Sequence, residues 1–154
     1  MTKIFLLTHE REVDKKTNTG RLVLACPTID SRRIIWRRTE PNEALIHLIE
    51  TDSIAMLYPS GGDNNPAKLE DFEHFLVLDS TWQESKKMIN KSPYLKQIPT
   101  VALATEASST FQRRRNQIEG GLCTAEVVIE LLRQRGDDDC ANHLKIQYQQ
   151  FNGL

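Results

Sequence analysis

The stretch that decides the fold reads Phe75-Leu76-Val77-Leu78-Asp79-Ser80-Thr81-Trp82. Its first four residues form a continuous apolar run of strand length, which is typical of a strand covered on both faces. The segment that begins at Trp82 places apolar residues on one helical face and therefore predicts a helix. Ser80 with Gln83, or Thr81 with Glu84, would make a capping box at its start. Asp79 is therefore expected at the carboxyl end of a central strand, where open α/β sheets bind ligands.

The rest of the chain alternates between strand and helix patterns. Apolar runs predict strands at residues 4–8, 33–36, 54–58 and 100–104, and amphipathic segments predict helices at 43–50, 122–135 and after Asp138 or Asp139. Residues 21–26 fit either a helix or a strand, which Pro27 ends. This alternation predicts an α/β fold, a mostly parallel sheet with helices on both faces. A chain of 154 residues without a linker or repeat predicts a single domain over residues 1–154.

Composition narrows the class of protein. A net charge of −1 argues against non-specific coating of nucleic acid, although it allows a local basic face. No apolar run approaches the roughly 20 residues that cross a bilayer, so no membrane segment is predicted. Cys26, Cys123 and Cys140 are widely spaced, and the histidines are scattered, so neither a disulfide framework nor a metal site is predicted. We expect a cytoplasmic protein.

Three polar loops follow predicted strands, at residues 9–20, 59–66 and 108–121. The carboxyl ends of parallel strands meet at one edge of a sheet, so these loops and Asp79 are expected to line one site; the alternative is that they are ordinary surface loops. The sequence contains no GxGxxG and no Walker lysine, so neither a Rossmann dinucleotide site nor a P-loop is supported.

Basic residues gather in three runs near these loops and alternate with Trp36, Trp82 and Phe111. Such a pattern indicates contact with an RNA backbone and unstacked bases, although a charge run is also compatible with a plain solvated face. The runs comprise Arg32, Arg33, Arg37 and Arg38, then Lys86, Lys87, Lys91 and Lys96, then Arg113, Arg114 and Arg115.

Four motifs occur in order along the chain. They are His9-Glu10-Arg11-Glu12 with Asn18-Thr19-Gly20-Arg21-Leu22, then Leu57-Tyr58-Pro59-Ser60, then Leu78-Asp79-Ser80-Thr81-Trp82, and finally Phe111 and Arg114 with Gly121-Leu122-Cys123-Thr124-Ala125-Glu126. Together they resemble the motifs of the DTW-domain family, the tRNA-uridine aminocarboxypropyltransferases. The chain departs from the family pattern at Glu10, Cys123 and Val127, where proline, serine and alanine are usual. It also lacks the amino-terminal zinc-binding cysteines of many relatives.

The resemblance implies a SPOUT-like fold with a trefoil knot, and S-adenosylmethionine as cofactor. It also implies transfer of the 3-amino-3-carboxypropyl group to N3 of a uridine in tRNA, which releases methylthioadenosine. The residues implied for catalysis are Asp79, Thr81 and Trp82. Those implied for the cofactor are Leu57, Tyr58, Pro59, Ser60, Gly121, Leu122, Thr124 and Glu126, and those for RNA are Asn18, Arg21, Lys86, Arg113, Arg114 and Arg115.

Alternatives stay open for both residues and function. Asp79 is either the base for the uridine N3 proton or a group that positions it, and Trp82 either stacks on a base or fills the core. Glu126 also suits a helix N-terminus without any ligand. The competing functions are RNA methyl transfer by a SPOUT-type enzyme and a non-catalytic RNA-binding domain.

Overall fold

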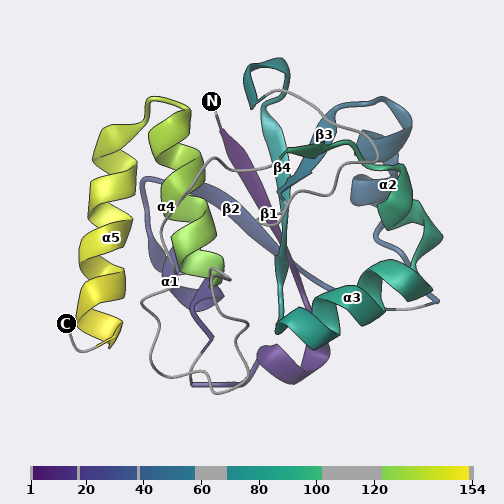
Figure 1. The fold of residues 1–154 in the computed structure, drawn as a ribbon, viewed down its shortest axis with the longest axis horizontal. Coiled ribbons are helices and arrows are strands. Elements are labelled where there is room, and N and C mark those ends of the chain that lie inside the picture. The colour runs from purple at the N-terminus through teal and green to yellow at the C-terminus, as the bar shows by residue number, and fades with distance from the viewer. Residues whose placement is uncertain (1, 17, 38, 58–68, 102–122, 153–154) are drawn as a thin grey trace.

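The structure, a computed structural model, describes residues 2–16, 18–37, 39–57, 69–101 and 123–152. Its centre is a five-stranded sheet in the order β2-β1-β4-β3-β5 (Figure 1). Every described strand pair is parallel. The strands are β1 (Lys3–Thr8), β2 (Asp30–Ile35), β3 (Ile54–Leu57), β4 (His74–Asp79) and β5 (Thr100–Val101).

Along the described part of the chain, five α-helices and three short 3₁₀ helices accompany the strands. They are α1 (Gly20–Ala25), α2 (Glu43–Glu50), α3 (Trp82–Lys91), α4 (Thr124–Gln134) and α5 (Asp138–Asn152), with η1 (Glu10–Glu12), η2 (Leu69–Asp71) and η3 (Pro93–Gln97). Figure 1 shows α1, α4 and α5 on one side of the sheet and α2 and α3 on the other. The predicted α/β class with a parallel sheet is confirmed, and residues 21–25 of the ambiguous segment prove to be helical, with Cys26 in an extended conformation after the helix. The SPOUT-like class and the knot stay predictions.

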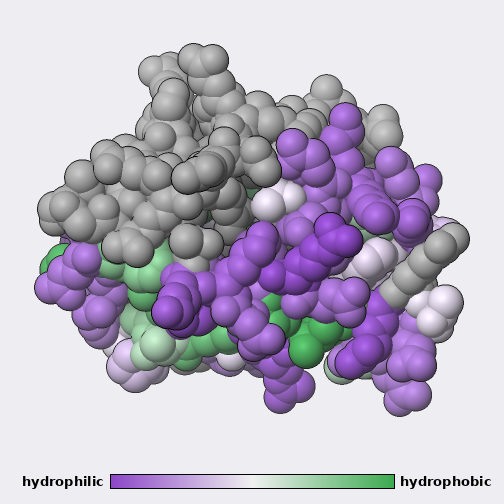
Figure 2. Space-filling view, turned by 90° about the horizontal axis from the view of Figure 1, so that it is seen from below, coloured by the Kyte–Doolittle hydropathy of each residue, from purple (hydrophilic) through white to green (hydrophobic). Residues whose placement is uncertain are grey.

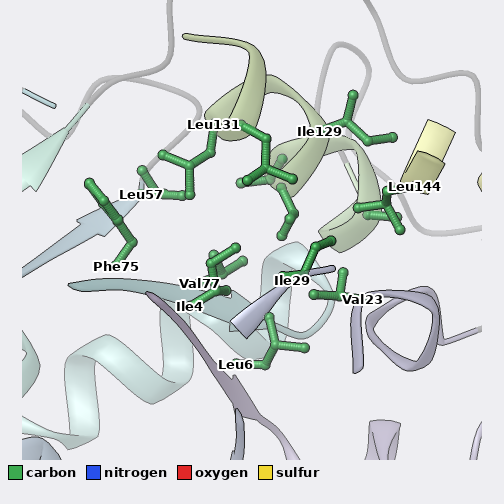
Figure 3. Close-up of a cluster of buried hydrophobic side chains, with 14 of the residues drawn as sticks. Ile4, Leu6, Val23, Ile29, Leu57, Phe75, Val77, Ile129, Leu131 and Leu144 are labelled. Carbon is green, nitrogen blue, oxygen red and sulfur yellow. The ribbon is translucent and has the colours of Figure 1, made fainter. Parts of the chain in front are cut away.

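The apolar run of β4 is explained by its central place in the sheet. Phe75 and Val77 point to one face and pack in a first core with Ile4 of β1 and Leu131 of α4 (Figure 3). Leu76 points to the opposite face and belongs to a second core. Because helices cover both faces, every side chain of the run meets apolar neighbours, whichever way it points.

The second core fixes the position of α3. Met88 and Leu95 are buried there against Leu7 of β1 and Leu76 of β4. The carboxyl end of β4 leads directly into α3, so this packing sets the direction in which the chain leaves Asp79.

Helix α3 begins with the capping box built from Thr81 and Glu84, not with the alternative pair of Ser80 and Gln83. The Thr81 hydroxyl accepts from the Glu84 amide at 3.1 Å, and Glu84 Oε1 accepts from the Thr81 amide at 2.9 Å. Gly136 ends the α4 segment at φ +83°, as expected for a left-handed glycine after a helix.

We predict that Met88→Ala destabilises the protein by about 2–5 kcal/mol, because it opens a cavity between α3 and the sheet. Urea unfolding followed by circular dichroism measures the free energy. Lys87→Ala, on the exposed face of the same helix, is the matched control and should stay within about 0.5 kcal/mol of wild type. Equal effects of the two substitutions would contradict the described packing of α3.

Candidate functional site

The carboxyl ends of β1 and β4 place two polar residues side by side. Thr8 ends β1 and Asp79 ends β4, and the two are partners in the parallel register. Both are fully buried, with 0% exposure. They follow Leu6 and Val77 at a spacing of two, so their side chains lie on the face that α1, α4 and α5 cover. A carboxylate is thus buried at the edge of the first core.

Four donors surround the Asp79 carboxylate. Oδ1 accepts from Asn18 Nδ2 at 2.9 Å and from Thr124 Oγ1 at 2.8 Å. Oδ2 accepts from Thr8 Oγ1 at 2.9 Å and faces Arg33 Nη2 at 3.5 Å. A carboxylate accepts about four hydrogen bonds at most, so these four contacts occupy all of its acceptor positions. Such donors offset the cost of burying the charge.

The segment Asn18-Thr19-Gly20 supplies three consecutive contacts to this region. Asn18 Oδ1 accepts from Arg33 Nη2 at 2.8 Å and from the Arg21 amide at 3.1 Å, while its Nδ2 donates to Asp79. The Thr19 hydroxyl accepts from the Ala125 amide at 3.1 Å. All of Asn18 and Thr19 is buried. The segment therefore connects Asp79 to the start of α4.

Gly20 lies against the carboxylate itself. A Cβ added at this position would stand 2.5 Å from Asp79 Oδ2 and 2.9 Å from its Cγ, closer than atoms of real side chains approach. The glycine is therefore required by close approach, because any side chain would displace the carboxylate from its donors.

The start of α4 completes the same region. Cys123 precedes the helix, and its amide donates to Glu126 Oε1 at 3.1 Å. Burial, followed by the charge of Glu126, raises the pKa of the Cys123 thiol to about 12. The thiol therefore stays protonated at neutral pH and is unsuited to act as a nucleophile.

On the other side of the strand ends, His9 joins the loop after β1 to α3. Its ring stacks on Trp36 with a centroid distance of 5.5 Å, and Trp36 Nε1 donates to Ser92 Oγ at 2.8 Å. Its Nδ1 accepts from the Arg11 amide at 3.1 Å and lies 3.9 Å from Glu84 Oε2. These contacts of His9 hold the loop after β1 against α3 and against Trp36.

The Glu84 carboxyl is held in its ionised form. Burial on its own would raise its pKa, but the Thr81 amide and the charges of His9 and Lys15 outweigh burial, and the pKa falls below the ordinary 4.5. The charge on Glu84 also suits its place in the first turn of a helix.

The structure brings together only part of the predicted site. Asp79 and Thr124 meet, and Thr81 serves as the cap of α3. Leu57, predicted to contact the cofactor, is buried in the first core at the end of β3. The predicted residues Tyr58, Pro59, Ser60, Gly121, Leu122, Arg113, Arg114 and Arg115, with the side chain of Trp82, lie outside the described part of the chain.

The residues predicted to bind RNA differ in exposure. Asn18 is buried by its contacts with Asp79 and Arg33. Arg21 is exposed, but its guanidinium donates to the carbonyls of Lys16 at 2.7 Å and Asn18 at 3.4 Å. Lys86 is exposed on α3. RNA contact by these three residues stays a prediction.

Two of the four donors to Asp79, Thr8 and Arg33, were missed from the sequence. Thr8 could have been found, because it is a polar residue at the end of an apolar strand, as Asp79 is. Arg33 gave no comparable signal, since it belongs to a run of basic residues. Only the structure shows that it points inward from β2, with its Nε buried and without a hydrogen-bond partner among the described residues.

Figure 2 views the molecule from the end at which the strands finish, and the described surface there is mainly hydrophilic with a narrow apolar band. Within the described ranges, no three His, Cys, Asp or Glu side chains are grouped to hold a metal ion. Among the same residues, no helix combines the length and apolar character needed to cross a membrane.

These features define an α/β protein with a polar site at the carboxyl edge of a parallel sheet. The family model of the DTW domain matches residues 1–153, so the chain belongs to the DTW-domain family, the family of tRNA aminocarboxypropyltransferases. The resemblance noted from the motifs is thereby confirmed, and family membership supports a general role in tRNA modification. No solved structure matches the chain.

We predict that Glu84→Gln lowers stability at neutral pH and that the difference from wild type shrinks in acid. A carboxyl with a lowered folded-state pKa stabilises the fold above its unfolded pKa, and this contribution is lost as pH falls through the folded value, here below 4.5. Glutamine keeps the oxygen that caps α3, so the cap itself is preserved.

Thermal unfolding midpoints between pH 7 and pH 3 measure this effect. Glu50→Gln, at the exposed end of α2, is the control and should follow wild type across the series. A Glu84→Gln difference that stays constant with pH would show that the charge makes no contribution.

Proposed function

We propose that this protein transfers the 3-amino-3-carboxypropyl group of S-adenosylmethionine to N3 of a uridine in tRNA. Family membership supports the reaction class. The observation that carries the proposal to this chain is the convergence of separate motifs at one sheet edge. Asn18 and Thr124, 106 positions apart in the sequence, both donate to Asp79. Ligands of open α/β sheets bind at such an edge.

Bound S-adenosylmethionine would supply a carbon bonded to a positively charged sulfur. The uridine N3 would form its bond to this carbon as the carbon–sulfur bond breaks, the bonding electrons would leave with neutral methylthioadenosine, and the N3 proton would pass to solvent water. Of the residues expected to bind the cofactor, Leu57 is apolar and the Thr124 hydroxyl donates to Asp79. Leu57 and Thr124 therefore fit a role in supporting the proposed cofactor site, without polar contacts of their own to the cofactor. Under the proposal, polar contacts fall to Tyr58, Ser60, Gly121 and neighbouring residues.

The chain's own contribution is mainly positional. A carbon and a nitrogen react when they are held about 3–3.5 Å apart and in line, and such positioning supplies much of the rate. Under the proposal, the paired strand ends at Thr8 and Asp79, together with the capped start of α3, hold the loop after β1 in place beside the uridine.

We also propose that the chain has a SPOUT-like path with a trefoil knot and that the protein is cytoplasmic.

The tRNA is proposed to approach over the carboxyl edge, beside the exposed lysines of α3. Lys86 and Lys87 lie in the middle of that helix, seven and eight positions after Asp79. Arg113, Arg114 and Arg115 are proposed to contribute phosphate contacts, a role that suits the bidentate guanidinium.

Product analysis tests the reaction. Purified protein, unmodified tRNA and S-adenosylmethionine are expected to yield methylthioadenosine and a uridine carrying the aminocarboxypropyl group, identified by chromatography and nucleoside mass spectrometry. A reaction without tRNA is the control. S-adenosylhomocysteine as product would establish methyl transfer instead, and tight tRNA binding with neither product would favour a binding domain.

We further predict that Arg114→Ala or Arg115→Ala reduces the slope of log affinity against log salt for tRNA by about 1 per lost phosphate contact. Arg133→Ala is the matched control, since this arginine is exposed on α4 and pairs with Glu130 at 3.3 Å. An unchanged slope with weaker cofactor binding would assign the substituted arginine to the cofactor's carboxylate.

A further inference from the structure

We infer that the Asp79 carboxylate is a positioning group, which holds the segment at residues 18–20 and the start of α4 against the sheet, and that, given the proposed function, it does not take the uridine proton. From the sequence, Asp79 was expected either to take the uridine N3 proton or to position it. Holding segments of the protein itself is a third role, and the arrangement of donors around the carboxylate favours this third role.

The first argument is the occupancy of the two carboxylate oxygens. Asn18 and Thr124 donate to Oδ1, while Thr8 donates to Oδ2 and Arg33 faces it. A general base must come within about 2.6–3.2 Å of the proton that it takes. The uridine N3–H would reach Asp79 only by displacing one of these donors.

The second argument is access. Asp79 is fully buried, so no solvent-exposed side of the carboxylate is open to a nucleobase. Gly20 closes one side so tightly that even a methyl group would come within 2.5 Å of Oδ2. A nucleobase is far larger than a methyl group, and its entry would require the segment at residues 18–20 to move away.

The third argument is that the donors come from separate parts of the chain. They come from the end of β1, the loop before α1, strand β2 and the start of α4, which are far apart in sequence. One buried charge thus connects four elements to β4. The Thr19 hydroxyl adds a direct bond to the Ala125 amide, so the loop and α4 are also joined to each other.

A positioning role makes a structural prediction that needs neither cofactor nor tRNA. Asparagine at position 79 offers one acceptor oxygen and one amino group to the same four donors, so Asp79→Asn should lower the thermal unfolding midpoint by about 3–12 °C. Hydrogen exchange at the Arg21 and Ala125 amides should accelerate, because Asn18 and Thr19, which accept from them, are no longer held. Unchanged stability and exchange would overturn the positioning role, whatever reaction the protein catalyses.

The pH profile of turnover separates positioning from proton transfer. Thr124→Val removes one donor without changing side-chain volume much, and losing a donor raises the pKa of a carboxylate. If Asp79 were the base, the acid limb of the profile would move to higher pH while the plateau was kept. If Asp79 only positions the surrounding segments, the acid limb should stay at the same pH, and the turnover at the plateau should fall by up to about tenfold.

Two controls complete the experiment. Thr124→Ser keeps the hydroxyl and should retain the turnover and stability of wild type, whereas Thr39→Val makes the same change at an exposed position between β2 and α2 and should leave both unchanged. A shifted acid limb with a preserved plateau would overturn the inference and identify Asp79 as the base. If product analysis finds no transfer at all, the stability and exchange measurements on Asp79→Asn still test the positioning role alone.

Discussion

The Asp79 carboxylate is the constraint on which the edge of this molecule depends. A buried charge without partners is costly, so its burial at the end of β4 requires donors from the surroundings. Thr8, Asn18 and Thr124 supply hydrogen bonds of 2.8–2.9 Å. Removing any one of them leaves the charge undersatisfied, and for this reason the positions of the three segments are not independent of one another.

Much of the fold could be predicted from the sequence. The apolar run of β4 and the pattern of α2 are strong local signals, and α2 is found at Glu43–Glu50 as predicted. Residues 21–26 fitted either structure, because a short segment that is apolar after Arg21 is compatible with both. The structure has a helix over Gly20–Ala25, with Val23 packed in the first core. Strand order depends on contacts distant in sequence, and no local pattern encodes it.

The site was predictable only where polarity interrupts an apolar pattern. Asp79 stands out because it follows a buried strand, and Thr8 carries the same signal in β1. The role of Asn18 was not predictable, because a polar loop residue gives no sign of whether it faces solvent or a buried charge. The register of β1 and β4 places Thr8 beside Asp79. The loop that follows β1 therefore passes the Asp79 carboxylate, and Asn18 of this loop can donate to it.

The wide sequence separation of these contacts has a consequence for assembly. Thr8 and Asp79 are 71 positions apart, and Thr19 and Ala125 are 106 apart. Contacts between distant segments are favourable only after the cost of closing long loops has been met, so we expect them to form late in folding. We therefore expect the carboxyl edge to be completed when α4 docks, with the loop at residues 18–20 reaching its final conformation in the same step. Order at the site is thus a property of the whole sheet and its covering helices, and it is not built into any one loop.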